Sequence, residues 1–200
     1  MKIKIKKEGK TKVFKLIQSW KDVNLETFLK LIEFQKGTKS SEAERTIAAL
    51  SDIPKDLIKK LELKDVAAIM NEVAQLQAEE KTTLKRIVEI GDKKYGFHPN
   101  LDSITLGEWA DIETFVTTDV EKYLPEVMAI LYRPIIEETE SGVYTIESYD
   151  GNVTIRAEEM KKMSAEQVQS ALVFFYHLGN EWSSNFKSSS METQKETTTQ

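Results

Sequence analysis

The chain has 200 residues, 40% hydrophobic and 8% aromatic, which is sufficient for an ordinary globular core. The absence of cysteine excludes disulfides, thiolate nucleophiles and sulfur-ligated metals, and no apolar run approaches the roughly 18 residues of a membrane-spanning helix. The net charge is −5, but residues 1–16 hold seven lysines and one glutamate, a net +6, so the rest of the chain carries −11. Any contact with nucleic acid would therefore have to use this basic segment.

Two β-hairpins are predicted, one near the start of the chain and one near its middle. Residues 2–7 alternate lysine with isoleucine and residues 13–17 form a second β-like run, which indicates a hairpin with one apolar face. Residues 84–90 and 93–97 repeat this design around Gly91-Asp92. The first run also lacks the continuous apolar stretch of a secretion signal, so we expect the protein in the cytoplasm of the cell that makes it.

Four helices are predicted between the two hairpins. Asn24 precedes an apolar stripe with spacings of three and four, typical of a capped amphipathic helix. Ser40 or Ser41 can cap the next helix, and Pro54 is suited to the start of a short one. In chain order the predicted helices cover residues 25–32, 42–50, 55–61 and 65–77.

The second half begins with a similar capped helix. Thr105 and Glu108 have the spacing of a capping box, in which each side chain accepts a hydrogen bond from the other residue's backbone N–H. A further helix is predicted over residues 119–131, where Pro125 must lie in a first turn or break the segment, and Pro134 is expected to stop it after Tyr132-Arg133.

The end of the chain is predicted to contain a third hairpin and a last helix. Residues 143–156 form two β-like runs around Asp150-Gly151, a dipeptide that favours the type I′ turn. Asp150-Gly151-Asn152 resembles a calcium-binding loop over only three residues, so we interpret it as a turn. The last helix is predicted to begin beside Ser164 and to end at Gly179, and residues 183–200 have the composition of a mobile tail.

The chain also matches itself. Residues 23–34 match residues 104–115 at a constant offset of 81, and the same offset relates residues 47–50 to residues 128–131. Beyond residue 131 the offset becomes 102, which places an insertion of 21 residues at the third hairpin. The sequence therefore predicts an internal duplication, a pattern typical of scaffolds and binding modules. The apolar matches are 23/104, 25/106, 28/109, 31/112 and 34/115.

Groups able to support catalysis are few. His98 and His177 are the only histidines, neither has a partner at ligand spacing, and we favour structural roles for both. The chain contains no phosphate-binding, zinc-protease or serine-hydrolase motif. We therefore predict no catalytic residue, no metal and no cofactor. The carboxylates that could converge on a cation also have the spacing of a solvated helix face, which we favour: Glu108, Asp111, Glu113, Asp119 and Glu121.

Three groups of residues are candidates for contact with a macromolecule. Lysines at positions 2, 4 and 6 suit either nucleic-acid contact or the protection of an exposed strand edge, and we favour the second. Tyr132, Arg133 and Ile135 suit a protein contact or core closure, of which core closure is favoured. The last helix is apolar around most of its circumference, which fits burial or a partner-facing surface. The residues concerned are Lys2, Lys4 and Lys6; Tyr132, Arg133 and Ile135; and Phe174, Tyr176 and Trp182.

Short strings of the chain resemble structural-module proteins of tailed bacteriophages, in particular tail-assembly chaperones. The strings are residues 19–28, 44–50 and 63–66, together with 104–112 and 131–135. The resemblance covers residues 10–180 and implies a binding protein without catalytic residues. The familiar chaperones do not typically show a clear second copy, so the resemblance leaves open whether the protein stays in the virion.

These observations predict an α+β protein built from two hairpin-plus-helices repeats, residues 1–80 and 81–182, that pack through apolar helix faces. The inserted hairpin is expected at residues 143–156. The predicted function is that of a non-enzymatic phage assembly or virion protein that binds another phage structural protein in the host cytoplasm. It requires no membrane, and the sequence leaves its oligomeric state open. The alternative is a nucleic-acid-binding or packaged internal virion protein that uses the basic hairpin.

Overall fold

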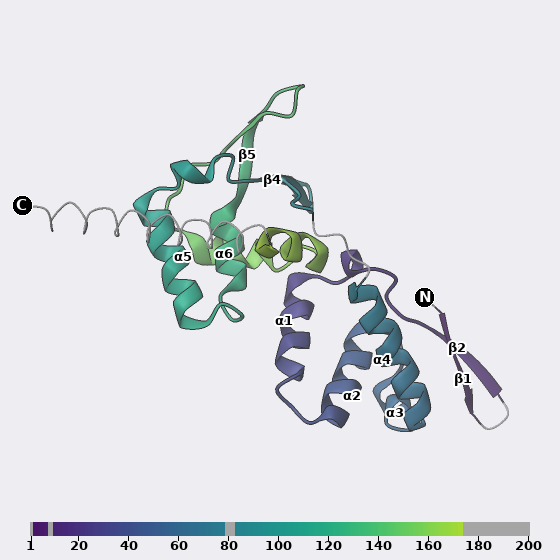
Figure 1. Cartoon of the computed structure of the whole chain (residues 1–200). Helices are drawn as coiled ribbons and strands as arrows, with labels where there is room; N and C mark the ends of the chain where they lie inside the picture. The colour runs from purple at the N-terminus through teal and green to yellow at the C-terminus, as the bar shows by residue number, and fades with distance from the viewer. Residues whose placement is uncertain (1, 8–9, 79–82, 174–200) are drawn as a thin grey trace, which may run out of the picture.

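A computed structural model describes residues 2–7, 10–78 and 83–173 of the chain (Figure 1). These residues form α-helices and antiparallel sheets, so the predicted α+β class is confirmed. Within the described ranges, no helix has both the length and the apolar character needed to cross a membrane.

The first half is a hairpin followed by helices. The predicted hairpin is present, with β1 and β2 antiparallel and Lys2 opposite Lys15 and Lys7 opposite Lys10. The second strand covers residues 10–15 and not the predicted residues 13–17. A short 3₁₀ helix, η1, leads into four α-helices whose starts and ends lie close to those predicted. The elements are β1 (Lys2–Lys7), β2 (Lys10–Lys15), η1 (Trp20–Asp22), α1 (Leu25–Phe34), α2 (Lys39–Leu50), α3 (Lys55–Ile58) and α4 (Leu63–Ala78).

The second half combines a sheet with helices. Its four strands pair antiparallel in the order β3-β4-β5-β6. Pro125 lies in the first turn of α6, so the segment is broken there as predicted, and α5 ends at Asp119. The elements are β3 (Ile87–Ile90), β4 (Lys93–Phe97), η2 (Leu101–Ser103), α5 (Leu106–Asp119), α6 (Leu124–Leu131), β5 (Tyr132–Glu138), β6 (Tyr144–Ile146) and α7 (Val153–Met160), followed by a helix that covers residues 165–173.

Side chains cap the major helices. The Asn24 side chain accepts a hydrogen bond from Thr27 N (2.9 Å), and Thr105 and Glu108 form the predicted capping box. Ser164 Oγ accepts from Gln167 N while Gln167 Oε1 accepts from Ser164 N, so the last helix begins where it was predicted. Helix α2 is capped by Thr38 and not by Ser40 or Ser41.

Two local predictions differ from the structure. Residues 143–156 do not form a hairpin, because β6 pairs with β5 and residues 153–160 are helical. Val153, Ala157 and Met160 recur at helical spacing and are all buried, so Gly151 (φ +76°) turns the chain into a helix and not into a strand. The helix stop predicted after Tyr132-Arg133 is present but lies two residues earlier, because α6 ends at Leu131 and both residues belong to β5. Pro134 disfavours helical backbone at Arg133 and favours an extended one.

Several features recur at the offset of 81 that the sequence shows. The ranges of η1 and η2 are 81 residues apart, and so are the last residues of α2 and α6. Ile17 N donates to Leu50 O (3.0 Å), and His98 N donates to Leu131 O (2.7 Å). The isolated bridge between residues 16 and 51 likewise corresponds to the β4–β5 pair between residues 97 and 132. The backbone thus follows the sequence offset.

The offset of 102 appears in the same way after the inserted strands. Three successive hydrogen bonds end α3, from the N–H groups of residues 59, 60 and 61 to the carbonyls of residues 55, 57 and 58. The bonds that end α7 run from residues 161, 162 and 163 to residues 157, 159 and 160. Helix α4 begins at residue 63 and the last described helix at residue 165.

The two halves meet where two helices begin. Leu25 N donates to Met163 O (2.7 Å) and Ala165 N donates to Val23 O (2.7 Å), which makes an antiparallel bridge between Asn24 and Ser164. Leu25 belongs to the core cluster formed otherwise by the second half, and Ala165 belongs to the cluster formed otherwise by the first half. This junction, residues 23–26 with residues 161–165, therefore ties the two cores together.

Candidate functional site

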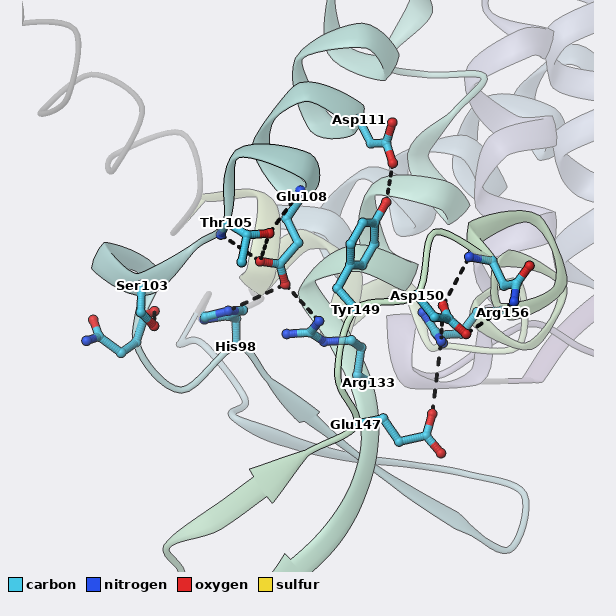
Figure 2. Close-up of polar contacts among 12 residues, drawn as sticks. His98, Ser103, Thr105, Glu108, Asp111, Arg133, Glu147, Tyr149, Asp150 and Arg156 are labelled. Atoms are coloured by element: carbon cyan, nitrogen blue, oxygen red, sulfur yellow. Dashed lines mark hydrogen bonds and ion pairs between the residues drawn. The ribbon is translucent and has the colours of Figure 1, made fainter.

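A cavity of about 490 Å³ in the second half collects its most deeply buried charged side chains. Glu108 comes from the first turn of α5, Arg133 from β5 and His98 from the end of β4, while Tyr149 lies in the segment between β6 and α7 (Figure 2). Because Pro134 holds residue 133 extended and the capping box holds Glu108, their side chains meet although 25 residues separate them in the sequence.

Both carboxylate oxygens of Glu108 are occupied. Oε2 accepts hydrogen bonds from Thr105 N and from Thr105 Oγ1, each at 2.7 Å. Oε1 lies 2.7 Å from Arg133 Nη1 in an ion pair whose side chains are only 2% and 5% exposed. Burial raises the pKa of Glu108, but the hydrogen bonds from Thr105 and the charge of Arg133 outweigh it and hold this pKa below its usual value.

His98 lies beside this pair and is uncharged at neutral pH. Its Nε2 atom is 3.7 Å from Glu108 Oε1, beyond hydrogen-bond distance. Burial lowers the pKa of His98, and the charge of Glu108 opposes this shift without cancelling it. Arg133 adds a further lowering effect, and its own pKa is lowered chiefly by burial. Glu108 and Arg133 therefore neutralise each other next to a neutral imidazole.

Three further hydroxyl groups that line the cavity have hydrogen-bond partners. The Tyr149 hydroxyl donates to Asp111 Oδ2, and burial is the main cause of its raised pKa. Ser103 Oγ donates to Asn100 O (2.7 Å). The Tyr144 hydroxyl donates to Phe97 O (2.7 Å). A hydroxyl engaged in this way is a poor nucleophile unless it is released. The Tyr149–Asp111 bond joins α5 to the segment between β6 and α7, while the Glu108–Arg133 pair joins α5 to β5.

The carboxylates weighed as a possible cation site are not brought together, but the favoured reading of a solvated helix face is wrong for Glu108, which is buried because Thr105 and Arg133 satisfy its carboxylate. Asp111 bonds with Tyr149, Glu121 pairs with Lys36 (2.8 Å), and Asp119 accepts from Lys122 N (3.1 Å). Among the residues that the structure describes, no three histidine or acidic side chains are placed to hold a metal ion.

The residues predicted for partner contact lie in different surroundings. Tyr132 and Arg133 are buried, so neither offers a surface anchor in this structure, and the favoured reading of core closure fits their position. The Tyr132 hydroxyl donates to Lys85 O (2.7 Å). Ile135 is half-buried opposite Ile146. The other predicted contact residues, Phe174, Tyr176 and Trp182, lie outside the described ranges, as do His177, Gly179 and the tail.

The basic residues Lys2, Lys4 and Lys6 occupy alternate positions of β1, which pairs only with β2 in the two-stranded sheet. Their partners in β2 are Lys15, Val13 and Thr11. The β1–β2 hairpin lies well away from β5, beyond helices α2–α4 (Figure 1).

Sequence reasoning missed two features of the second half. The first is the Glu108–Arg133 pair, since each residue was considered separately. The second is the arm formed by residues 135–146, which includes the ends of β5 and β6 and projects from the helices (Figure 1). Ile136 and Val143 are exposed on this arm, and the outer edge of β6 is one of the two edges of the sheet that no described strand covers. Residues 143–146 were predicted as a β-like run, but neither β5 nor its pairing with β6 was predicted.

Comparison of the chain with protein-family models, with curated proteins and with solved structures finds no match.

Proposed function

We propose that this protein is a non-enzymatic bacteriophage assembly or virion protein that binds another phage structural protein. The resemblance to tail-assembly chaperones suggests the phage setting. The observation that carries the binding role is the projecting arm, which exposes Ile136 and Val143 beside a free strand edge. An extended segment of a partner can add to such an edge, with its backbone hydrogen bonds giving affinity and neighbouring apolar side chains giving specificity.

The repeated architecture supports a binding role as well. We propose that an ancestral hairpin-plus-helices unit was duplicated, because hydrogen bonds recur at offsets of 81 and 102 in the two halves. The buried ionisable groups of the cavity neutralise one another, which suits a rigid support better than a reaction centre. The α5 helix, held by Glu108 and Arg133, fixes the sheet from which the arm projects.

Co-expression with neighbouring phage structural genes tests this function. The full chain is expected to recover one of their products in a fixed stoichiometry, and Ile136→Ser with Val143→Ser is expected to abolish that recovery. Ile155→Ser is the matched control, because Ile155 is equally exposed but lies on α7, away from the arm. Recovery that is unchanged in the arm variant, or no recovery with any product of the gene cluster, would contradict the proposal.

A second candidate is nucleic-acid binding by the basic hairpin. The observation that favours it is the presence of seven lysines in or beside one two-stranded sheet. Retardation of DNA at low salt that weakens steeply as salt rises, and that disappears when Lys2, Lys4 and Lys6 become glutamine, would support it. An absence of retardation at low salt would exclude it.

A further inference from the structure

In the junction, the first repeat unit contributes residues 23–26 and the second contributes residues 161–165. Each unit also contains a segment equivalent to the one that the other unit contributes. At the offset of 81, residues 23–26 of the first half correspond to residues 104–107 of the second. At the offset of 102, residues 161–165 correspond to residues 59–63. In the part of the chain that the structure describes, the second pair of surfaces, residues 104–107 and 59–63, is not joined, as the exposure of the leucines at its centre shows.

Exposure separates the joined surfaces from the unjoined ones. Leu25 and Ala165, at the centre of the junction, are both 0% exposed. Their counterparts Leu106 and Leu63 are 83% and 86% exposed, the highest values among the large hydrophobic side chains that the structure describes. Each is the first residue of a helix, α5 or α4. The central side chains are thus buried where the surfaces meet, and the leucines at the equivalent positions are exposed where the surfaces do not meet.

Backbone donors show the same difference. In the junction, Leu25 N and Ala165 N donate to carbonyls across the boundary. Within the described ranges, Leu106 N and Leu63 N donate to no protein acceptor, as expected for the first N–H of a helix. The junction bonds, transferred by the two offsets, would run from Leu106 N to the carbonyl of Leu61 and from Leu63 N to the carbonyl of Ile104.

Charge is also complementary at the unjoined surfaces. Across the junction, Lys21 Nζ lies 3.8 Å from Glu166 Oε1. The residue 81 positions after Lys21 is Asp102, and the residue 102 positions before Glu166 is Lys64. The acidic and the basic position are therefore swapped, but residues 102 and 64 still carry opposite charges. An attractive contact would therefore form at the same place if residues 104–107 met residues 59–63.

We propose that copies of this chain associate head to tail, with residues 104–107 of one copy joined to residues 59–63 of the next in the manner of the internal junction. The inference rests on the duplication in the proposed function and adds a second binding surface, distinct from the arm. Because the contact joins two different surfaces, the growing assembly keeps one free surface at each end. It extends as a filament unless the rotation between successive copies closes it into a ring.

The test uses two full-length variants, Leu63→Asp and Leu106→Asp, each changed at an exposed helix-start position where aspartate is compatible with the helix. The wild type is expected to form oligomers whose mass increases with concentration in analytical ultracentrifugation. Each variant alone is expected to associate at least about tenfold more weakly. An equimolar mixture is expected to form a complex of two chains and no larger species, because one intact surface remains on each partner.

The charged pair provides an independent measurement. Asp102→Lys and Lys64→Asp are each expected to weaken association, and the double variant is expected to recover it, because the pair is restored with its signs exchanged. A wild type that stays monomeric at every concentration, oligomers that persist in both leucine variants, or a mixture that yields no two-chain complex would overturn the inference. If association fails while a phage structural protein is still recovered through the arm, the inference falls and the proposed function stands.

Discussion

Arg133 and Glu108 form a buried ion pair that joins β5 to the first turn of α5, with 2.7 Å between Nη1 and Oε1. A buried charge is tolerated when an opposite charge pairs with it. Removing one partner therefore lowers stability more than replacing both partners with uncharged side chains.

Replacing Arg133 with methionine is expected to lower the free energy of unfolding by about 3 kcal/mol, because a buried carboxylate then loses its cation. The double variant Glu108→Gln with Arg133→Met should be less destabilised than the sum of the two single variants. Chemical denaturation measures all three. Lys30→Met serves as the control, since Lys30 pairs with Glu26 at an exposed position and its loss is expected to have no measurable effect. Additive effects at residues 108 and 133 would contradict the coupling.

Stability is expected to fall as the pH is lowered from about 6.5. The pKa of His98 is lower in the folded protein than its ordinary value of 6.5, so the unfolded chain binds a proton first. The stability that depends on neutral His98 is fully present above the pKa of His98 in the unfolded chain. It is lost as the pH falls through the pKa of His98 in the folded protein. Denaturation curves at several pH values, compared with those of His98→Phe, measure it. An unchanged pH profile in the variant would show that other groups cause the dependence.

Gly96 is expected to tolerate no side chain. A Cβ atom there would lie 2.4 Å from the Tyr144 ring, and the Tyr144 hydroxyl is held by Phe97 O. Gly96→Ala should therefore cost about 1–3 kcal/mol in thermal or chemical unfolding. Gly107→Ala is the control and should be neutral or stabilising, because its nearest neighbour is 4.0 Å away and the site is helical. A Gly96→Ala cost that is not reduced in the Tyr144→Ala background, where Ile146 Cγ2 still lies 2.8 Å from the added Cβ, would contradict the steric explanation.

Proline is expected to be tolerated at one helix start and not at another. Ala165→Pro removes the N–H that donates to Val23 O across the junction and should destabilise the protein by about 1 kcal/mol or more. Leu106→Pro occupies the first position of α5, where the N–H has no described partner, and should leave the stability of the dilute protein unchanged. Equal melting temperatures for the two variants would show that the junction bond contributes little.

Local features of the fold could be predicted because they depend on residues close together in the chain. Asn24, Thr105 and Ser164 cap helices in the structure, and each is identified by its own side chain and its position before an apolar stripe. The same reasoning failed for residues 153–156, where β-branched residues after Asp150-Gly151 suggested a strand but burial of Val153, Ala157 and Met160 favours a helix. Local preference is weaker than packing when the two disagree.

The candidate site could not be predicted in this way. The capping box made Glu108 a recognisable residue, but its pairing with Arg133 depends on β5 lying against β4, a contact between segments distant in the sequence. Tyr132 and Arg133 looked equally suited to a surface or to the core, because amphipathic side chains fit both, and only the sheet decided between them.

The sequence by itself determined the composition of the two halves, the caps of α1, α5 and the last described helix, and the offsets of 81 and 102, since all of these are properties of neighbouring or matching residues. The tertiary structure alone decided which of the equivalent surfaces are covered. Leu25 and Leu106 occupy matching positions in the sequence, yet one is buried and the other exposed, because burial depends on the neighbour that the folded chain brings to each surface.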